Sequence, residues 1–245
     1  MHYKTSPSEN IKMKEKAKWT SKRIFSISLL LASAILITVS SIMFDNRPLL
    51  QRVLLTAPLY VSLVIGMLQS GANRFSYLLG GLNCIVYTVA YIILGLYASA
   101  ASTLLFSCPI QLITFWRWSK RSYKQSTEFK RLKPIHWILG GIVFAICFVL
   151  IQFVLKAASS SYPTLDNLAT LVGLTVSILS LLSFREYSWL MPVTCLINLI
   201  LFFVMAMDDP AQITYLIYAI NSMICITMQF FSVRKIYAEQ RSNIS

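Results

Sequence analysis

Four side chains suited to hold a small ligand stand close together: Gln111, Thr114, Phe115 and Trp118. They recur at i, i+3, i+4 and i+7, so a helix would present them on one face. That face would offer an amide, a hydroxyl and two aromatic rings, which stack on a flat heterocycle and attract a cationic one through cation–π interaction. The pattern predicts a binding site, although Trp at the end of a membrane helix is also typical of the interfacial belt.

Amides are the other polar side chains of interest, and Asn198 and Asn221 are the two that we assign to the same site. An amide in hydrocarbon has to find a partner, because an unpaired polar group is costly to bury. Hydrogen bonding between helices is the alternative role, worth about 0.6 kcal/mol on average. We expect these amides to converge on one cavity and to contact a ligand there.

Eight long uncharged segments must position these residues. They are 24–44, 53–69, 75–96, 100–116, 135–155, 167–184, 189–207 and 211–233. Each has roughly the 17–25 residues needed to cross a bilayer core of about 30 Å. None of them contains Asp, Glu, Lys or Arg. The predicted fold class is therefore an all-α integral membrane protein with eight transmembrane helices.

The charged residues are divided unevenly between the two sides of these spans. With the N-terminus in the cytoplasm, the cytoplasmic segments 1–23, 70–74, 117–134, 185–188 and 234–245 hold 19 of the 22 Lys and Arg residues. The outer loops hold only Arg47, Arg52 and Lys156. This split follows the positive-inside rule and predicts a bacterial inner-membrane protein with both termini in the cytoplasm. It also accounts for the net charge of +13 without a nucleic-acid partner, and we expect the basic segments to contact membrane lipid.

Several kinds of chemistry lack their residues in this chain. No paired Ser and His, HExxH motif or carboxylate cluster is present, so we predict no enzyme activity, metal or cofactor. No GxxxxGK(S/T) motif is present either, which excludes ATP hydrolysis by the chain itself. Because no carboxylate lies within the predicted spans, an ion relay has no obvious residue, and passage down a gradient is favoured.

Two triplets of spans form an internal repeat on either side of the basic loop 117–134. An Arg precedes the middle span of each triplet and an Asn lies within it: Arg74 and Asn83 in the first, Arg185 and Asn198 in the second. The two spacings, 9 and 13 residues, differ by about one helical turn. One linker span gives both triplets the same orientation, and parallel repeats are a known transporter plan, with the substrate near the midplane between them.

The predicted domain boundaries follow from this plan. Residues 1–52 form a basic cytoplasmic tail and an additional N-terminal transmembrane helix, 53–121 the first three-helix repeat, 122–163 a basic loop and the linker helix, 164–235 the second three-helix repeat, and 236–245 a cytoplasmic tail.

The order of several motifs resembles the PnuC-type transporters of nicotinamide riboside and other B vitamins. The stretches 73–83, 96–99 and 111–118 are similar to the second and third core helices of that family. Asp166 and the stretches 185–198 and 221–235 are similar to its last three core helices. The resemblance covers about 53–235, which is most of the chain.

This resemblance implies a 3+1+3 helix fold similar to the SWEET sugar transporters, with one additional N-terminal helix. It implies facilitated diffusion of a vitamin, trapping of the vitamin by a cytoplasmic kinase, and a homotrimer. Family members carry two Trp before the Asn of the corresponding helix, and Trp189 matches one of them. The candidate site therefore consists of Gln111, Thr114, Phe115, Trp118, Trp189, Asn198 and Asn221. Its rings would stack on the heterocycle, and its amides would bind ribose or carboxamide groups.

The family motif and this chain differ in ways that bear on the substrate. Members that carry nicotinamide riboside show Asn-x-x-Gly-Trp-x-x-Trp, where this chain has Gln111, Thr114, Phe115 and Trp118. Nicotinamide riboside is the leading substrate, and thiamine, riboflavin or a nucleoside are alternatives. A non-transporting membrane sensor or assembly subunit is the alternative from another class of function.

Overall fold

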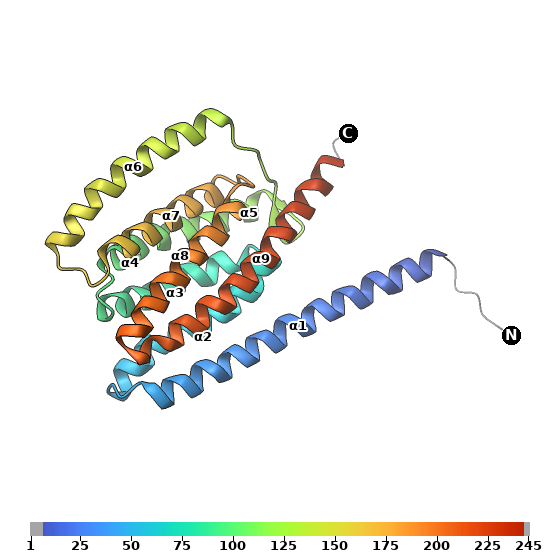
Figure 1. The fold of residues 1–245 in the computed structure, drawn as a ribbon. Coiled ribbons are helices and arrows are strands. Elements are labelled where there is room, and N and C mark those ends of the chain that lie inside the picture. Colours follow the sequence, from blue (N-terminus) through green and yellow to red (C-terminus); the bar gives the residue numbers. More distant parts are fainter. Residues whose placement is uncertain (1–6, 243–245) are drawn as a thin grey trace.

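The computed structural model describes residues 7–242, with side chains from residue 24 onward, as a helical protein with one small hairpin (Figure 1). Within that range, eight segments are long and apolar enough to cross a membrane, as predicted. The elements are α1 (Pro7–Phe44), α2 (Leu49–Ser70), α3 (Phe75–Ile93), α4 (Tyr97–Ser102), η1 (Thr103–Ser107), α5 (Cys108–Lys120), β1 (Ser122–Tyr123), β2 (Ser126–Thr127), α6 (Pro134–Ala157), α7 (Pro163–Leu181), α8 (Tyr187–Asp208), η2 (Pro210–Gln212) and α9 (Ile213–Ser242).

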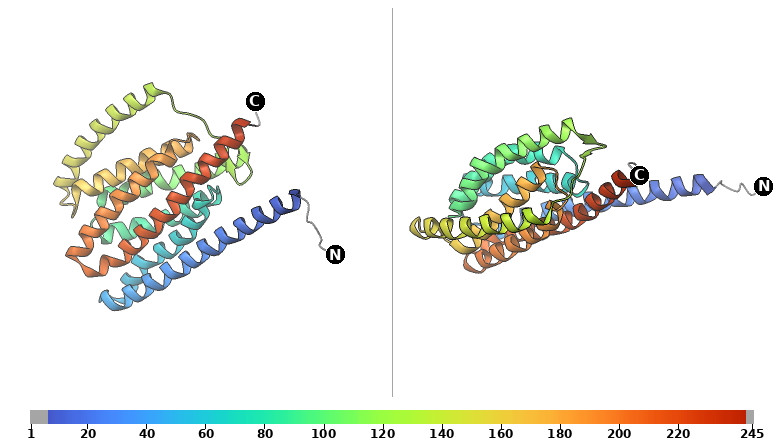
Figure 2. Two further views of the ribbon diagram at one scale, coloured as in Figure 1. Left: turned by 45° about the vertical axis from the view of Figure 1, so that its right-hand side comes forward. Right: turned by 90° about the horizontal axis from the view of Figure 1, so that it is seen from above.

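The two predicted triplets form a closed ring whose members follow chain order. Figure 2 shows this bundle in two further views, with α1 extending past one end of it. In the first triplet, α3 packs between α2 and the helix made of α4, η1 and α5. In the second, α8 packs between α7 and α9. The triplets meet at two seams. We call the contact of α2 with α9 the α2–α9 seam, and the contact of α4, η1 and α5 with α7 the α5–α7 seam.

Two helices lie outside this ring (Figure 1). α1 packs on α2 and α9, and it therefore covers the α2–α9 seam. α6 packs mainly on α7 and carries a nearly continuous exposed apolar surface, in which Leu155 is the one buried residue. The N-terminal end of α1 and the C-terminal end of α9 lie at the same end of the bundle. An even number of spans requires this arrangement.

The triplets share one backbone motif at the turn between their first two helices. Ala72 and Ser183 occupy this turn with positive φ, 51° and 60°. The Ala72 N–H donates to the Gln69 carbonyl at 2.8 Å, and the Ser183 N–H donates to the Ser180 carbonyl at 2.9 Å. In both pairs the residue numbers differ by 111 (72 and 183, 69 and 180). This difference sets the register of the repeat.

The register confirms one sequence pairing and corrects another. Arg74 and Arg185 are equivalent, and each donates its backbone N–H to the basic loop that follows α5, to Gln125 and Lys130 respectively, at 3.0 Å. Asn83 and Asn198 are not equivalent, because their numbers differ by 115 and they lie about one turn apart in the repeat. The different Arg-to-Asn spacings had already indicated this offset.

Three boundaries differ from the sequence prediction. α1 is one continuous helix from Pro7, about 57 Å long at 1.5 Å per residue, so the tail and the first span share it. The predicted span 100–116 is interrupted by the π-helical turn η1 just before Pro109, which has no N–H to continue the α-helical ladder. Asp166 lies in the first turn of α7, because that helix begins at Pro163. The expectation that no span contains a carboxylate is therefore wrong at this position.

Apolar side chains pack in two clusters toward opposite ends of the ring. The cluster near Asp45, Asp166 and Asp209 is mainly aliphatic, and we call this end the acidic end. The cluster beside the loop 121–133 is rich in aromatic residues, and we call this end the basic end. A polar cavity lies between the two clusters.

Candidate functional site

A cavity of about 280 Å³ lies inside the ring and is lined by residues of all six ring segments. Its wall is made of amides, hydroxyls, thiols, tyrosines and a few apolar side chains. The polar members include Ser62, Gln69, Ser76, Tyr77, Asn83, Tyr87, Tyr91, Thr103, Ser107, Gln111, Thr114, Ser177, Ser180, Asn198, Tyr218 and Ser222. Among the described residues, no Asp, Glu, Lys, Arg or His lines it.

Equivalent positions of the two repeats face each other across this cavity. The following pairs differ by 111 in number, and both members of each pair line the wall: Ile65 and Val176, Gln69 and Ser180, Gly80 and Met191, Cys84 and Cys195, Tyr87 and Asn198, Tyr91 and Phe202, Ser107 and Tyr218, Gln111 and Ser222. The cavity therefore lies at the centre of the internal repeat, where a parallel-repeat transporter binds its substrate.

Gln111 reaches the cavity because α3 has glycine at the point of contact. A Cβ on Gly80 would lie 1.9 Å from Gln111 Oε1, and a Cβ on Gly81 would lie 2.7 Å from Leu112 Cδ2. Glycine at these two positions lets the ends of the α5 side chains lie directly against the α3 backbone. The Gln111 amide group has one weak contact, with Cys84 Sγ at 3.5 Å, so most of its hydrogen-bonding capacity is free for a ligand.

Tyrosines supply most of the aromatic part of the wall, and none of them was among the predicted site residues. Tyr87 and Tyr91 stack with ring centroids 5.3 Å apart and planes inclined by 25°. The Ser62 hydroxyl donates to the Tyr87 hydroxyl at 3.0 Å and holds that ring at the wall. Positions 80, 84, 87 and 91 follow i, i+4, i+7 and i+11, so this helical stripe of small residues and tyrosines was the available signal.

The candidate amides divide into a cavity residue and a packing residue. Asn198 lines the cavity, and within the described part of the chain no hydrogen bond occupies its side chain. Asn221 is buried outside the wall, where its Oδ1 accepts from Cys225 Sγ at 3.5 Å. Asn83 touches the cavity, but its Nδ2 is used by the Pro58 carbonyl at 3.0 Å and Ser62 Oγ at 2.9 Å. Of these three asparagines, Asn198 is thus the one most available to a ligand.

Trp118 closes the basic end of the ring rather than lining the cavity. It is fully buried, and its Nε1–H donates to the Ser180 carbonyl at 3.0 Å. Its ring packs edge-on against Tyr77 at 4.7 Å, Phe129 at 5.6 Å and Tyr187 at 6.1 Å. Tyr77 also lines the cavity, so this aromatic layer is the cavity floor at the basic end.

The two remaining aromatic candidates lie outside the cavity. Phe115 packs against Phe75 with centroids 5.6 Å apart. Trp189 is 57 % exposed and packs edge-on against Phe230 at 5.7 Å. Of the seven predicted site residues, the structure therefore brings Gln111, Thr114 and Asn198 to the wall, and it leaves Phe115, Trp118, Trp189 and Asn221 off it.

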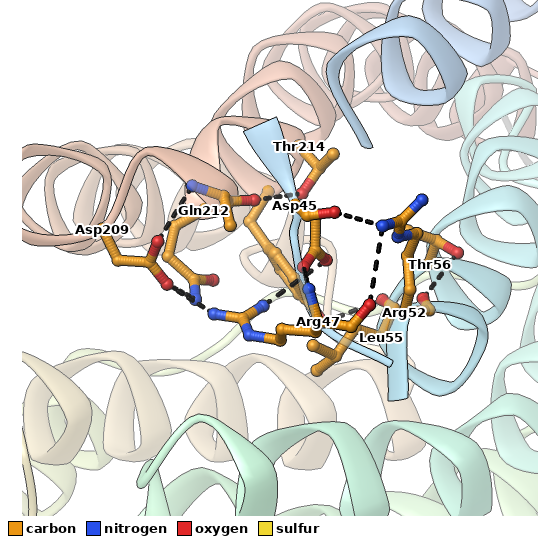
Figure 3. Close-up of polar contacts among 10 residues, drawn as sticks. Asp45, Arg47, Arg52, Leu55, Thr56, Asp209, Gln212 and Thr214 are labelled. Atoms are coloured by element: carbon orange, nitrogen blue, oxygen red, sulfur yellow. Dashed lines mark hydrogen bonds and ion pairs between the residues drawn. The ribbon is translucent and has the colours of Figure 1, made fainter. Parts of the chain in front are cut away.

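Ionic contacts close the α2–α9 seam at the acidic end (Figure 3). Figure 3 shows Arg47 extending between Asp45 and Asp209, with Gln212 beside Asp209. Arg47 forms ion pairs with Asp209 and with the buried Asp45, the latter at 3.6 Å, and Gln212 Nε2 donates to Asp209 at 3.1 Å. Arg52 donates to the Asp45 carbonyl from the first turn of α2. The network ties the start of α2 to the start of α9.

One carboxylate closes the α5–α7 seam at the same end. Asp166 is fully buried on α7, and it accepts from the backbone N–H groups of Ala98 at 3.0 Å and Ser99 at 3.1 Å. The Ser99 hydroxyl also donates to it. These N–H groups begin α4 and have no partner within that helix, so Asp166 caps α4 from the other repeat.

A tyrosine links the loop before α7 to the end of α8. The Tyr162 hydroxyl donates to Asp208 at 2.7 Å. Burial and the neighbouring carboxylate raise the pKa of Tyr162 to about 12, so the phenol stays protonated at neutral pH and keeps this bond.

Comparison with known proteins supports the same architecture. A crystal structure described as that of the vitamin B3 transporter PnuC superposes with a TM-score of 0.72 at 17 % sequence identity. The superposition covers 89 % of this chain and 92 % of that chain, so the two proteins share a fold. No curated protein sequence matches this chain.

A sequence profile gives the family. The profile described as nicotinamide mononucleotide transporter matches residues 52–229, which are more than half of the chain and begin where the ring begins. The matched segment holds every residue of the cavity wall. The chain therefore belongs to the nicotinamide mononucleotide transporter (PnuC) family of multi-pass membrane transporters.

Proposed function

We propose that this chain carries a B-vitamin nucleoside, with nicotinamide riboside as the leading substrate, across the membrane by facilitated diffusion. The observation that carries the proposal is the neutral polar wall of the central cavity, to which both repeats contribute equivalent positions. Amides and hydroxyls suit a ribose and a carboxamide, and tyrosine faces suit a pyridinium cation.

The same wall argues against a phosphorylated substrate. Nicotinamide mononucleotide adds a phosphate, which carries a charge of about −1.5 to −2 at pH 7. No Arg, Lys or His among the described residues lines the cavity, so that charge would be buried without a counter-ion. An unpaired buried charge costs several kcal/mol. We therefore favour the riboside over the mononucleotide that gives the family its name.

The size of the cavity fits a ligand of this class. Its volume of about 280 Å³ is close to the lower end of the range of about 300–1,000 Å³ typical of small-molecule sites. Thiamine, which is not a nucleoside, and nucleosides other than the riboside also carry flat heterocycles on a molecule of comparable size and remain alternatives. Riboflavin, with its three fused rings, needs the most room.

The neutral cavity also explains how the imported vitamin would be retained in the cytoplasm. With the basic end in the cytoplasm, as the charge distribution predicts, both termini are cytoplasmic. A cytoplasmic kinase would add a phosphate that the neutral cavity does not accept, so the product would not return. We further expect a homotrimer, in which the exposed apolar surface outside the ring supplies the contacts between copies.

Uptake into sealed proteoliposomes without an ion gradient tests this function. We expect saturable entry of labelled nicotinamide riboside, competition by unlabelled riboside and no competition by the mononucleotide. Gln111→Ala and Asn198→Ala should each lower uptake at subsaturating substrate about tenfold, the effect of losing one ligand hydrogen bond of about 1.4 kcal/mol.

Gln152→Ala is the matched control, because it removes an amide from α6, outside the ring, where Gln152 donates to Thr164 at 2.9 Å. It should leave uptake close to that of the wild type. If thiamine or riboflavin entered saturably and nicotinamide riboside did not, the proposed substrate would be wrong. The absence of any saturable flux for this panel would favour the non-transporting sensor or assembly subunit.

A further inference from the structure

A second pocket lies on the outer side of α8 and α9 at the basic end, away from the central cavity. Its volume is about 310 Å³, and its polar and aromatic walls are Arg185, Ser188, Trp189, Arg234, Tyr237 and Arg241. It shares no residue with the central cavity, so transport as proposed above gives it no role.

The charge of this pocket is positive and largely uncompensated. Arg234 and Arg241 have no carboxylate within ion-pair distance among the described residues. Arg185 pairs with Glu186 at 3.3 Å, but the second oxygen of Glu186 accepts the Leu132 N–H at 3.1 Å. Glu239, the next carboxylate on α9, is held by Lys124 at 2.7 Å and Lys235 at 3.8 Å. An anion is the ligand that this charge requires.

Aromatic rings hold two of the guanidinium groups in position. The Arg185 guanidinium lies over the Tyr237 ring, 4.4 Å from its centroid. The Arg234 guanidinium lies 5.4 Å from the centroid of Phe230, and Phe230 in turn packs against Trp189. A planar guanidinium stacked on a ring keeps its N–H groups available for a phosphate and loses little rotamer freedom on binding one.

The pocket lies at the height of lipid headgroups. α9 needs about 20 residues to cross a bilayer, so its part beyond residue 233 extends past the apolar core. Arg234, Ala238 and Arg241 follow i, i+4 and i+7 on that extension and share one face. Trp189 and Phe231, 57 % and 61 % exposed, lie on the apolar side of them, as interfacial aromatic residues do.

The first repeat fills the equivalent place with protein. In the register of 111, Arg234 corresponds to Tyr123 and Tyr237 to Ser126, and these two residues belong to the hairpin β1–β2. α5 ends at Lys120, and the hairpin loop folds back so that Gln125 accepts the Arg74 N–H. α9 continues as a helix instead. The pocket is thus a feature of the second repeat alone.

We propose that this pocket binds the phosphate group of an anionic phospholipid, with Arg234 and Arg241 on the phosphate and Trp189 beside the glycerol and acyl chains. A bound lipid would bridge the start of α8 and the extension of α9, and it would stabilise the basic end of the second repeat. A free phosphate ester offers the same charged group, but it has no acyl chains to cover the exposed faces of Trp189 and Phe231.

Thermal unfolding of the full chain in detergent, with defined lipids added, tests the site. Phosphatidylglycerol should raise the unfolding midpoint by several degrees more than phosphatidylcholine with the same acyl chains, because a ligand that binds only the folded state stabilises it. Arg234→Gln/Arg241→Gln should lose most of that difference. Lys120→Gln/Arg121→Gln is the matched control, because it removes two exposed charges at the end of α5 and should keep the difference.

Each other result overturns the proposal. Equal responses of the two double variants to phosphatidylglycerol would reduce the effect to general attraction between basic residues and anionic lipid. A midpoint shift of the same size with soluble glycerol 3-phosphate would assign the pocket to a free phosphate ester. If Arg234→Gln/Arg241→Gln unfolds on purification, the same comparison in Trp189→Ala, which keeps both charges, decides between the outcomes: a lost difference supports the pocket, and a retained difference overturns the proposal.

Discussion

The two seams that close the ring differ in construction, although the repeat makes them equivalent. At the acidic end, the α2–α9 seam is held by partly exposed ion pairs around Arg47, whereas the α5–α7 seam is held by one buried carboxylate, Asp166. At the basic end, the register of 111 pairs Trp118 with Gln229. Trp118 fills its seam with an aromatic ring, while Gln229 donates to the Tyr187 hydroxyl at 3.1 Å.

The difference indicates which seam can change shape. α9 is regular from Ile213 to Ser242, and α1 covers its seam from outside. The corresponding helix of the first repeat contains η1, whose residues Thr103 and Ser107 line the cavity. None of the five residues of η1 is buried, so this turn is enclosed less completely than the buried parts of the ring. We therefore expect rearrangement during transport to occur along the α5–α7 seam.

The largest difference in stability between the seams should appear when Trp118 and Gln229, which occupy equivalent positions, are each replaced. Trp118→Ala removes a fully buried ring and should lower the free energy of unfolding by about 3–5 kcal/mol. Gln229→Leu should change it by less than about 1 kcal/mol, because Gln229 Oε1 is buried with no hydrogen-bond partner among the described residues, and a similar apolar side chain removes that cost. Thermal or denaturant unfolding in detergent measures both. Equal losses in the two variants would contradict the comparison.

The second largest difference in unfolding free energy should be between variants of Asp166 and Asp209. Asp166→Ala leaves two backbone N–H groups of α4 unpaired in a buried place and should cost about 3 kcal/mol of unfolding free energy. Asp209→Ala breaks an ion pair whose carboxylate side chain is 45 % exposed and removes the acceptor of the Ala211 N–H and of Gln212, and it should cost about 1–2 kcal/mol. Raising the salt concentration should weaken the Asp209 pair and leave the buried Asp166 bonds nearly unchanged. If Asp209→Ala lost more unfolding free energy than Asp166→Ala, the conclusion that Asp166 stabilises its seam more strongly would be wrong.

Two glycines, one in each repeat, give the smallest predicted effect on stability. A Cβ on Gly80 would meet the end of the flexible Gln111 side chain, so Gly80→Ala should cost about 1 kcal/mol or less and raise the KM for uptake by displacing the amide. A Cβ on Gly173 would meet only Thr194 Cγ2 at an ordinary 3.8 Å, so Gly173→Ala should be neutral or stabilising by about 0.5–1 kcal/mol. Uptake and unfolding of the two variants check the pair. An unchanged KM in Gly80→Ala would remove Gln111 from the substrate site.

Most of the fold could be predicted from the sequence, for a physical reason. Uninterrupted apolar segments such as 135–155 have no stable place other than a membrane, so their number and the repeat could be predicted. The ends of these segments could not be placed as well. Asp166 lies inside α7 because its carboxylate caps α4, and no local sequence pattern indicates such a contact between the two repeats. The break at η1 was signalled only by Pro109.

The residues of the cavity wall were predicted in part, because hydropathy does not tell which face of a helix meets the ring interior. Gln111, Thr114 and Asn198 reach the cavity wall, as expected for uncharged polar groups at membrane depth. Trp118 was predicted to stack on a ligand. A large aromatic ring can equally well fill the space between two helices, and Trp118 is fully buried in the α5–α7 seam. The tyrosines of α3 were missed, since a stripe such as Tyr87 and Tyr91 is equally typical of helix packing.

Calorimetric titration of nicotinamide riboside into the purified protein tests the central claim most directly, namely that the substrate occupies the cavity between the repeats. Ser222 is equivalent to Gln111 and lines the opposite wall, so Ser222→Phe would fill the cavity from the second repeat. The account predicts saturable binding to the wild type and binding at least about tenfold weaker in Ser222→Phe, a difference of about 1.4 kcal/mol, in a variant that still unfolds cooperatively. Binding of unchanged affinity in that folded variant would contradict it.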